Sequence, residues 1–197
     1  VMASVLVLGL GNRRMTADAL GDRVVSGILV TRHMQEERLR SVCAVAPGVL
    51  GITGVETAEL ALGLAERVKP SAVIVVDALA AMETAHIGTT IQLTDTGIRP
   101  GSGVGNHRCP LSRDTLGVPV YAIGVPTVVD AATLTLDVLE EAGKSNVDPA
   151  ALRGHETVMV TTRDIDAQIR ELARIIGYGI DLALQPLSFS ELCTLMG

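Results

Sequence analysis

The sequence predicts an α/β fold, with a single doubly wound and mostly parallel sheet flanked by helices. Short apolar runs at residues 5–8, 42–45, 72–76 and 118–125 alternate with helical periodicity, and strand-helix-strand order implies parallel pairing through right-handed crossovers. Only three residues are aromatic, so Val, Leu, Ile and Ala must fill the core, as is usual in a helix-covered parallel sheet. The 197 residues suffice for one core, and we expect a single domain over residues 1–197.

The first predicted crossover carries a glycine-rich turn and an aspartate. The strand at residues 5–8 leads into a GLGN turn at residues 9–12, and Leu, Val and Ile then recur at helical spacing over residues 19–33. Asp18 stands directly before this expected helix, where a short polar side chain can cap free backbone N–H groups. Taken alone, its position is explained by helix capping.

A second aspartate follows the next apolar strand. A helix is expected over residues 55–68, with Thr53 or Gly54 as its cap. The strand at residues 72–76 comes next and is expected to end at Asp77. This strand should lie parallel to the first one.

The second half of the chain contains a long glycine-rich loop. Residues 89–93 alternate polar and apolar side chains, which indicates an edge strand or an antiparallel partner. The loop at residues 94–106 follows, and its N–H groups can cradle a substrate backbone or an anion. The other expected elements are a strand at residues 118–125, a helix that Pro126 opens and that ends near residue 142, a polar connection at 143–155 and a helix at 163–184.

Asp18 and Asp77 are expected to converge at one edge of the sheet, because ligands bind at the carboxyl ends of parallel strands. Two carboxylates that lie close together repel, which raises one pKa and lets the pair share a proton near neutral pH. The ionised member can take a proton from a water that attacks a carbonyl, while the protonated member polarises that carbonyl. The pair therefore indicates acid/base chemistry, with the two roles left open.

The composition argues against several other classes of protein. A net charge of −6, a pI of 5.2 and only three aromatic residues disfavour direct nucleic-acid binding. Cys43, Cys109 and Cys193 are odd in number and outside any CxxC pattern, so free thiols in a reducing compartment are expected; catalysis by Cys109 beside His107 is a weaker alternative.

No leader or membrane anchor is expected. No apolar run reaches the ~18 residues that span a bilayer, and no signal peptide opens the chain, so a cytoplasmic location is expected. The first strand begins within a few residues of the Val-Met-Ala start, which favours a partial or processed chain.

Two familiar motifs are incomplete. The GLGN turn lacks the third glycine of a dinucleotide-binding GxGxxG, since Arg14 stands there, and no phosphate-binding GxxxxGK(S/T) loop occurs. The Asp-Thr-Gly triplet at residues 95–97 matches pepsin-like aspartic proteases, but those are β-rich and need two such motifs or a dimer, so we interpret the match as a coincidence. Asp95 still follows a strand beside the glycine-rich loop and ranks third among the acids.

Several short blocks resemble the signature motifs of the germination (spore) protease family, in that family's order. The VMVT segment at residues 158–161 and the helix after it resemble the family's C-terminal part. The blocks are LGLGN at residues 8–12, TADALG at 16–21, LVTRH at 29–33, APGV at 46–49, DALA at 77–80, TDTGI at 94–98, PGSGVGN at 100–106 and GVPTVVDA at 124–131.

The resemblance implies an aspartic-type endopeptidase that initiates the degradation of small acid-soluble spore proteins during germination and cleaves after an acidic residue. It implies a phosphorylase/hydrolase-like fold similar to the hydrogenase-maturation endopeptidases, a homotetramer and a location in the spore core. From composition and hydropathy, no direct nucleic-acid or membrane partner is expected. Family members also carry an N-terminal propeptide that is lost on activation of the zymogen. Residues 1–197 are therefore expected to be a single α/β peptidase domain that lacks this N-terminal region.

The resemblance places the two essential aspartates of the family on Asp18 and Asp77. In the maturation enzymes the matching positions are a Glu and an Asp that bind a metal together with a later His. Here His86 and His107 lie to either side of the matching strand, so no metal or cofactor is expected. The alternatives are a metal-dependent maturation-type endopeptidase and a catalytically silent peptide- or nucleotide-binding module of the same fold. Supporting residues that can hold the substrate or the oxyanion, with turn chemistry as the alternative role, are Asn12, Asp95, Gly103 and Asn106.

Overall fold

The strand that carries Asp77 lies in the middle of the sheet. The computed structural model describes residues 4–34, 36–101, 108–144, 146–152 and 154–196. Within these ranges the strand order is β2-β1-β3-β5-β4, and β6 pairs with the carboxyl end of β5. The first four strands in that order are parallel, whereas β4 and β6 run antiparallel to β5. The strands are β1 (Val5–Gly9), β2 (Val42–Val45), β3 (Ala72–Ala80), β4 (Gln92–Thr94), β5 (Val120–Asp130) and β6 (Met159–Val160).

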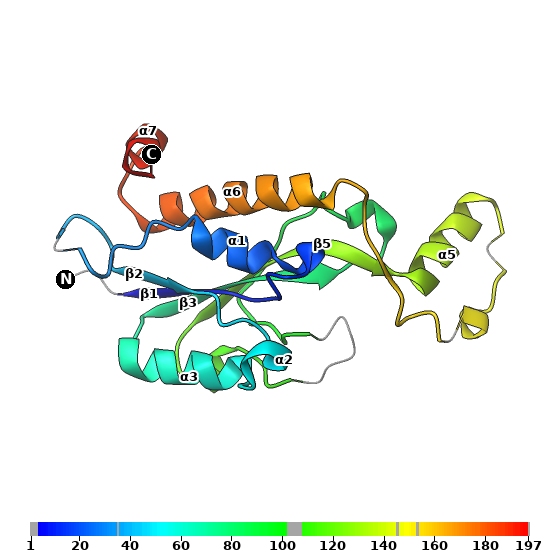
Figure 1. Ribbon diagram of the computed structural model, residues 1–197, viewed down its shortest axis with the longest axis horizontal. Helices are drawn as coiled ribbons and strands as arrows, with labels where there is room; N and C mark the ends of the chain where they lie inside the picture. The colour runs from blue at the N-terminus through cyan, green and yellow to red at the C-terminus, as the bar shows by residue number, and fades with distance from the viewer. Residues whose placement is uncertain (1–3, 35, 102–107, 145, 153, 197) are drawn as a thin grey trace.

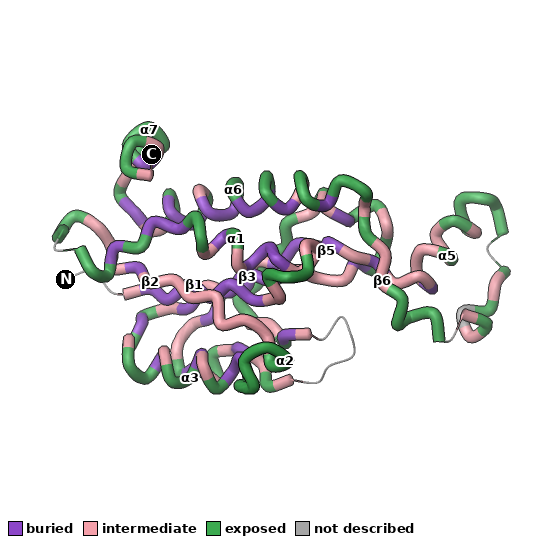
Figure 2. Tube along the Cα trace, viewed as in Figure 1, coloured by how far each residue is buried: buried purple, intermediate pink, exposed green. Residues whose placement is uncertain are grey.

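Helices cover both faces of the sheet, which confirms the predicted doubly wound α/β fold (Figure 1). On one face, α1 (Leu20–Ser26) and α6 (Ile165–Leu184) pack over a core that includes Val7 and Val76. On the other face, α3 (Thr57–Val68) and α4 (Arg113–Leu116) pack over Leu8 and Val75. Alternate strand residues thus supply opposite cores. Figure 2 shows the buried residues concentrated in the strands and along the sheet-facing side of α6.

The strand β5 runs through Pro126 to Asp130, so the predicted helix start at Pro126 is wrong. The helix α5 (Ala131–Glu141) follows, and Asp130 caps it by accepting the N–H of Thr133 at 2.8 Å. The register between β3 and β5 shifts after the Leu79–Pro126 pair. Such a bulge tolerates a proline, which has no N–H to donate to the ladder.

The first helix is shorter than predicted, because α1 ends at Ser26 and residues 27–33 form a loop. The end of α6 holds this loop. Asp181 accepts the N–H of Leu29 with both carboxylate oxygens, at 3.1 and 3.2 Å, and Gln185 accepts the N–H of Arg40 at 2.9 Å and donates to its carbonyl oxygen at 3.0 Å. The N–H of Leu29 is therefore satisfied by a side chain of α6, and those of Thr31 and Arg32 by the carbonyl oxygen of Val42, instead of by helix formation.

The remaining boundaries follow local capping and packing. Glu56, rather than Thr53 or Gly54, caps α3, and Glu59 completes a capping box. The antiparallel edge strand expected at residues 89–93 is confirmed as β4, although it covers only Gln92–Thr94. The long helix α6 is also confirmed. The remaining described elements are α2 (Leu50–Thr53), α7 (Phe189–Met196), which was not predicted, and three 3-10 helices: η1 (Thr16–Asp18), η2 (Thr84–His86) and η4 (Pro149–Leu152).

At one end of the molecule, α5 extends away from the sheet (Figure 1). The helix α7 lies near the other end and is joined to α6 by an edge-on contact between the rings of Tyr178 and Phe189, whose centroids are 5.4 Å apart. Among the described helices, none is long and apolar enough to cross a membrane.

Candidate active site

Asp77 lies within β3 and not at its end, since the strand continues to Ala80. The expectation that the strand ends at this aspartate is therefore wrong. The ladder between β1 and β3 stops at the Gly9–Val76 pair, so Asp77 is the first residue of β3 without a partner in β1, while Gly124 of β5 lies opposite it. The side chain is 6% exposed, and its Oδ1 accepts the N–H of Ala78 at 3.0 Å.

The pKa of Asp77 is raised to about 7. Burial is the larger cause, because the ionised carboxylate loses its hydration, and the neighbouring charge of Asp18 raises the pKa further. The N–H of Ala78 acts in the opposite direction but is outweighed. The side chain therefore exchanges a proton near neutral pH, the range in which a general acid or base is most effective.

Asp18 ends the 3-10 helix η1, which packs against β3, β5 and α6. Its Oδ2 accepts the N–H of Asn12 at 2.8 Å. Helix capping does not explain its position, because the N-cap of α1 is Ala19 and no side chain caps that helix. Burial raises the pKa of Asp18, while the Asn12 N–H and the positive charge of Arg108 partly offset this effect.

Close packing of glycines brings Asp18 to the edge of β3. Gly11 has a φ of 103°, and a Cβ there would overlap the carbonyl oxygen of Asp18 and lie 2.9 Å from its Oδ1. A Cβ on Gly21 of α1 would lie 2.6 Å from the carbonyl oxygen of Val76. Glycine is therefore required where the turn contacts Asp18 and where α1 crosses β3.

Arg108 is a member of the site that the sequence reasoning missed. The glycine-rich loop returns to its own start through an antiparallel bridge in which Ile98 and Leu111 exchange N–H···O bonds of 2.9 and 2.8 Å. This closure brings Arg108 close enough to Asp18 to lower its pKa. Leu111 is 0% exposed and fixes the returning chain, and no local pattern in the sequence indicates this contact.

The four supporting candidates fall in different places. Asn12 lies beside Asp18, but its N–H makes that contact, and its side-chain Oδ1 accepts the N–H of Arg14 at 3.0 Å in a local turn. Asp95 is exposed after β4, next to a hydrogen bond of 2.8 Å between the hydroxyls of Thr94 and Thr96. Gly103 and Asn106 lie outside the described residues. The substrate-holding roles of these four residues stay predictions.

A metal site needs several ligand side chains close together. Across the described ranges, no three His, Cys, Asp or Glu side chains gather in an arrangement that could hold a metal ion. His86 belongs to η2, whereas His107 is outside those ranges. The expectation of metal-free chemistry stays a prediction. What the described residues do provide is two coupled carboxylates with a nearby arginine, a set suited to proton transfer.

Two solved structures are similar to this chain, each with a TM-score below 0.5. A NiFe hydrogenase maturation protease from Thermococcus kodakarensis KOD1 is 18% identical, with a TM-score of 0.45 over 89% of this chain and 90% of that chain. A hydrogenase maturating endopeptidase from E. coli is 19% identical, with a TM-score of 0.37 over 82% of this chain and 99% of that chain.

Sequence relatives are closer. The protein named germination protease from Caldanaerobacter subterraneus subsp. tengcongensis is 46% identical over 92% of this chain and 66% of its own length, and that from Clostridium acetobutylicum is 44% identical over 96% and 68%. The chain thus spans about two thirds of the length of these relatives. Residues 1–146 match the family model described as germination protease. The chain belongs to the germination protease family.

Proposed function

We propose that the protein is an aspartate-dependent endopeptidase that initiates the degradation of small acid-soluble spore proteins during germination. The observation that carries this proposal is the coupling of Asp18 and Asp77, two carboxyl groups whose pKa values are both raised at the point where β1 leaves β3. Membership of the germination protease family supports the class of reaction. The pairing of two carboxyls with perturbed pKa values supports the mechanism.

The surroundings of the two carboxyls favour different roles. Asp18 accepts an N–H from Asn12 and lies near Arg108, and both interactions favour its ionised form. Asp77 is the more deeply buried and holds the shared proton near neutral pH. Asp18 is therefore the base and Asp77 the acid at the start of the cycle.

The reaction follows from these roles. Asp18 takes a proton from water as the water oxygen attacks the scissile carbonyl carbon, and Asp77 donates a hydrogen bond to the carbonyl oxygen, where negative charge develops. When the C–N bond breaks, the proton held by Asp18 passes to the leaving amine. The carboxyl pair is then restored to its starting state, with one proton shared between the two side chains.

The test is cleavage of a small acid-soluble spore protein by Asp18→Asn and Asp77→Asn variants. Asp114→Asn is the matched control, because Asp114 is exposed on α4 and takes no part in the pair. Each active-site variant should stay folded and lose at least about 100-fold in kcat. Mass measurement of the products gives the cleavage position, expected after an acidic residue. Full activity in either active-site variant would falsify the mechanism.

The proposal extends to the form in which the protein works: a homotetramer, matured from a zymogen, that acts in the spore core on spore proteins and needs no metal. Light scattering of the purified protein should give four times the mass of the chain. Exhaustive chelation should leave cleavage unchanged. A large loss of activity that Zn²⁺ or Ni²⁺ restores would instead favour a metal-dependent maturation-type endopeptidase.

A further inference from the structure

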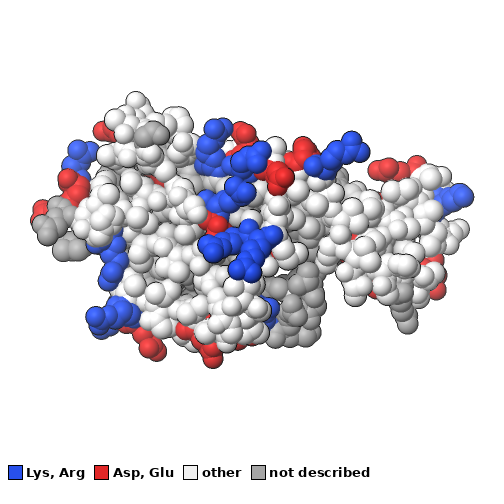
Figure 3. Space-filling model, in the orientation of Figure 1, with Lys and Arg blue, Asp and Glu red and all other residues white. Residues whose placement is uncertain are grey.

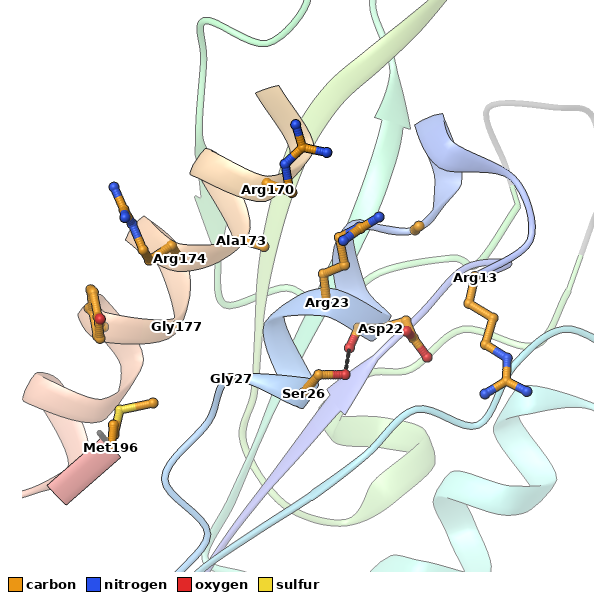
Figure 4. Close-up of a pocket in the computed structure, with 12 residues that line it drawn as sticks. Arg13, Asp22, Arg23, Ser26, Gly27, Arg170, Ala173, Arg174, Gly177 and Met196 are labelled. Carbon is orange, nitrogen blue, oxygen red and sulfur yellow. Dashed lines mark hydrogen bonds between the residues drawn. The ribbon is translucent and has the colours of Figure 1, made fainter. Parts of the chain in front are cut away.

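A groove lined by arginines lies between α1 and α6, on the face of the sheet opposite α3 (Figure 4). Its volume is about 550 Å³. Small residues, among them Ala19, Gly27, Ala173 and Gly177, line it where the two helices approach each other. We call it the arginine groove after Arg13, Arg23, Arg170 and Arg174, which also line it.

Three of the four groove arginines carry charge that no carboxylate of the described residues neutralises. All four are exposed, and Asp22 is the single acidic residue in the lining. Within the described ranges the one ion pair is between Arg174 and Glu171, at 3.2 Å, so Arg13, Arg23 and Arg170 have no carboxylate within 4.0 Å there. Figure 3 shows blue side chains gathered over the middle of the view, with red ones among them. A cationic cluster of this kind is notable on a chain of net charge −6.

The arginines form a row rather than a ring. Arg170 and Arg174 project from the same side of α6, one turn apart, while Arg23 lies across the groove on α1 and Arg13 at its far end (Figure 4). Like charges one turn apart on a helix repel each other, and Glu171 offsets this repulsion at Arg174 only. Because exposed ion pairs are individually weak, only a ligand with several negative charges along its length would bind. Each guanidinium can hold a carboxylate through two N–H groups.

We propose that the arginine groove binds an acidic polypeptide segment in extended conformation. In such a segment alternate side chains point the same way, and their carboxylates can follow the row of arginines. The groove has the volume of an ordinary ligand site but only one aromatic residue, Tyr178, in its lining, so it offers no stacking platform for nucleic-acid bases.

The groove adjoins the candidate active site along the chain. Ala19 directly follows Asp18, and Arg13 directly follows Asn12, whose N–H binds the Asp18 carboxylate. A bound acidic segment would therefore anchor a substrate near the turn that carries the base. This role in substrate capture rests on the proposed function, whereas the binding of an acidic peptide does not.

Binding is measured first, by fluorescence anisotropy with a labelled decapeptide of alternating Glu and Gly, on the Asp77→Asn background so that no cleavage occurs. The peptide should bind more weakly as salt is raised, and the same peptide with Gln in place of Glu should not bind. Arg170→Gln/Arg174→Gln should weaken binding at least about tenfold. The matched control is Arg67→Gln on α3, on the other face of the sheet, which should change binding less than about twofold.

Several results would overturn the proposal. They are equal binding of the Glu and Gln peptides, no binding at all, or the same loss in the Arg67 control as in the groove variant. Tighter binding of a single-stranded oligonucleotide of equal charge would overturn the choice of a peptide ligand. Circular dichroism of each variant separates loss of binding from loss of fold.

The second arm tests substrate capture. A spore-protein substrate with an appended acidic segment should show a lower KM than the same substrate without it. In Arg170→Gln/Arg174→Gln this gain should disappear, whereas the Arg67→Gln control should keep it. If the acidic peptide binds in the first experiment but the appended segment leaves KM unaltered, only the role in substrate capture is overturned. If no substrate is cleaved, the proposed protease function fails, and the binding arm still decides the nature of the groove.

Discussion

Asp77 is buried beside Asp18, and its burial together with the charge of Asp18 raises its pKa to about 7. In the unfolded chain an aspartate has a pKa of about 4. Between these values the folded protein binds a proton that the unfolded chain does not, so the free energy of unfolding decreases as pH rises from about 4 to about 7. The candidate active site thus lowers the stability of the fold at neutral and alkaline pH.

We expect Asp77→Asn to raise the melting temperature at pH 8, because the amide is neutral and resembles the protonated carboxyl group. At pH 5, where Asp77 is already protonated in the folded protein, the variant and the parent should melt within a few degrees of each other. Thermal unfolding at the two pH values measures this difference. An equal shift at both would mean that charge is not the cause.

Arg108 should set the acidic limb of the pH–activity profile. Its charge lowers the pKa of Asp18, so in Arg108→Gln that pKa rises. The Asp18 carboxylate is then protonated at a higher pH than in the parent. The acidic limb of kcat/KM should therefore move to higher pH. Arg108→Lys should restore most of the shift, and Arg113→Gln on α4, which is exposed, should leave the profile in place. An unmoved limb in Arg108→Gln would show that this arginine does not act on the base.

Gly11→Ala should harm both stability and activity. The φ of 103° is strained for alanine, and the new Cβ would overlap the carbonyl oxygen of Asp18. We expect a loss of about 1–3 kcal/mol in the free energy of unfolding, measured in urea, together with a large fall in kcat as Asp18 is displaced.

Gly54→Ala is the matched control for this substitution. Gly54 has a φ of 71° but open space around its Cα, so its replacement adds backbone strain without a clash. It should cost about 1 kcal/mol and leave kcat unchanged. If Gly11→Ala retained full activity at a similar cost in stability, close packing against Asp18 would not be what positions the base.

Asp181 offers a test of a second buried carboxyl group. It is 1% exposed, and burial raises its pKa to about 6 although it accepts the N–H of Leu29. Because this pKa lies above the unfolded value, the stability that Asp181 contributes decreases as pH rises from about 4 to about 6. Asp181→Asn retains an acceptor oxygen and should be at least as stable as the parent at pH 7.

Asp181→Leu should behave differently, because it leaves the N–H of Leu29 buried without an acceptor. We expect it to lose about 1–3 kcal/mol in urea unfolding at pH 7. Equal stability of the Asn and Leu variants would show that water satisfies Leu29 and that the hydrogen bond does not hold the loop.

Much of the fold could be predicted because its strands are buried on both faces. Such strands are uniform apolar runs, and β1 to β3 were found within a few residues of their bounds. The local sequence pattern predicted the wrong structure where contacts with distant residues determine it. Residues 27–33 have helical spacing but form a loop bound by α6, and Pro126 suggests a helix start but lies in a bulge of β5.

The candidate active site, like the fold, could be predicted from the sequence only in part. The two aspartates could be chosen from their places beside strand ends, together with the family resemblance. Their convergence could be expected from the order of the strands, but how closely they approach depends on how the GLGN turn packs on η1. Arg108 could not be chosen either, since only the pairing of Ile98 with Leu111 brings it near Asp18.

The contacts that α6 makes with the loop after α1 also constrain how the protein folds. Leu29 and Asp181 are 152 residues apart, and Arg40 and Gln185 are 145 apart. Pairings this distant form slowly, because a long loop must close before any contact rewards it. On the ribosome, β1 and α1 emerge before α6, so the apolar face that includes Val7 and Val76 is covered only in part until α6 is synthesised. The 3-10 helix η1, which carries Asp18, therefore acquires its final surroundings only after α6 has been made.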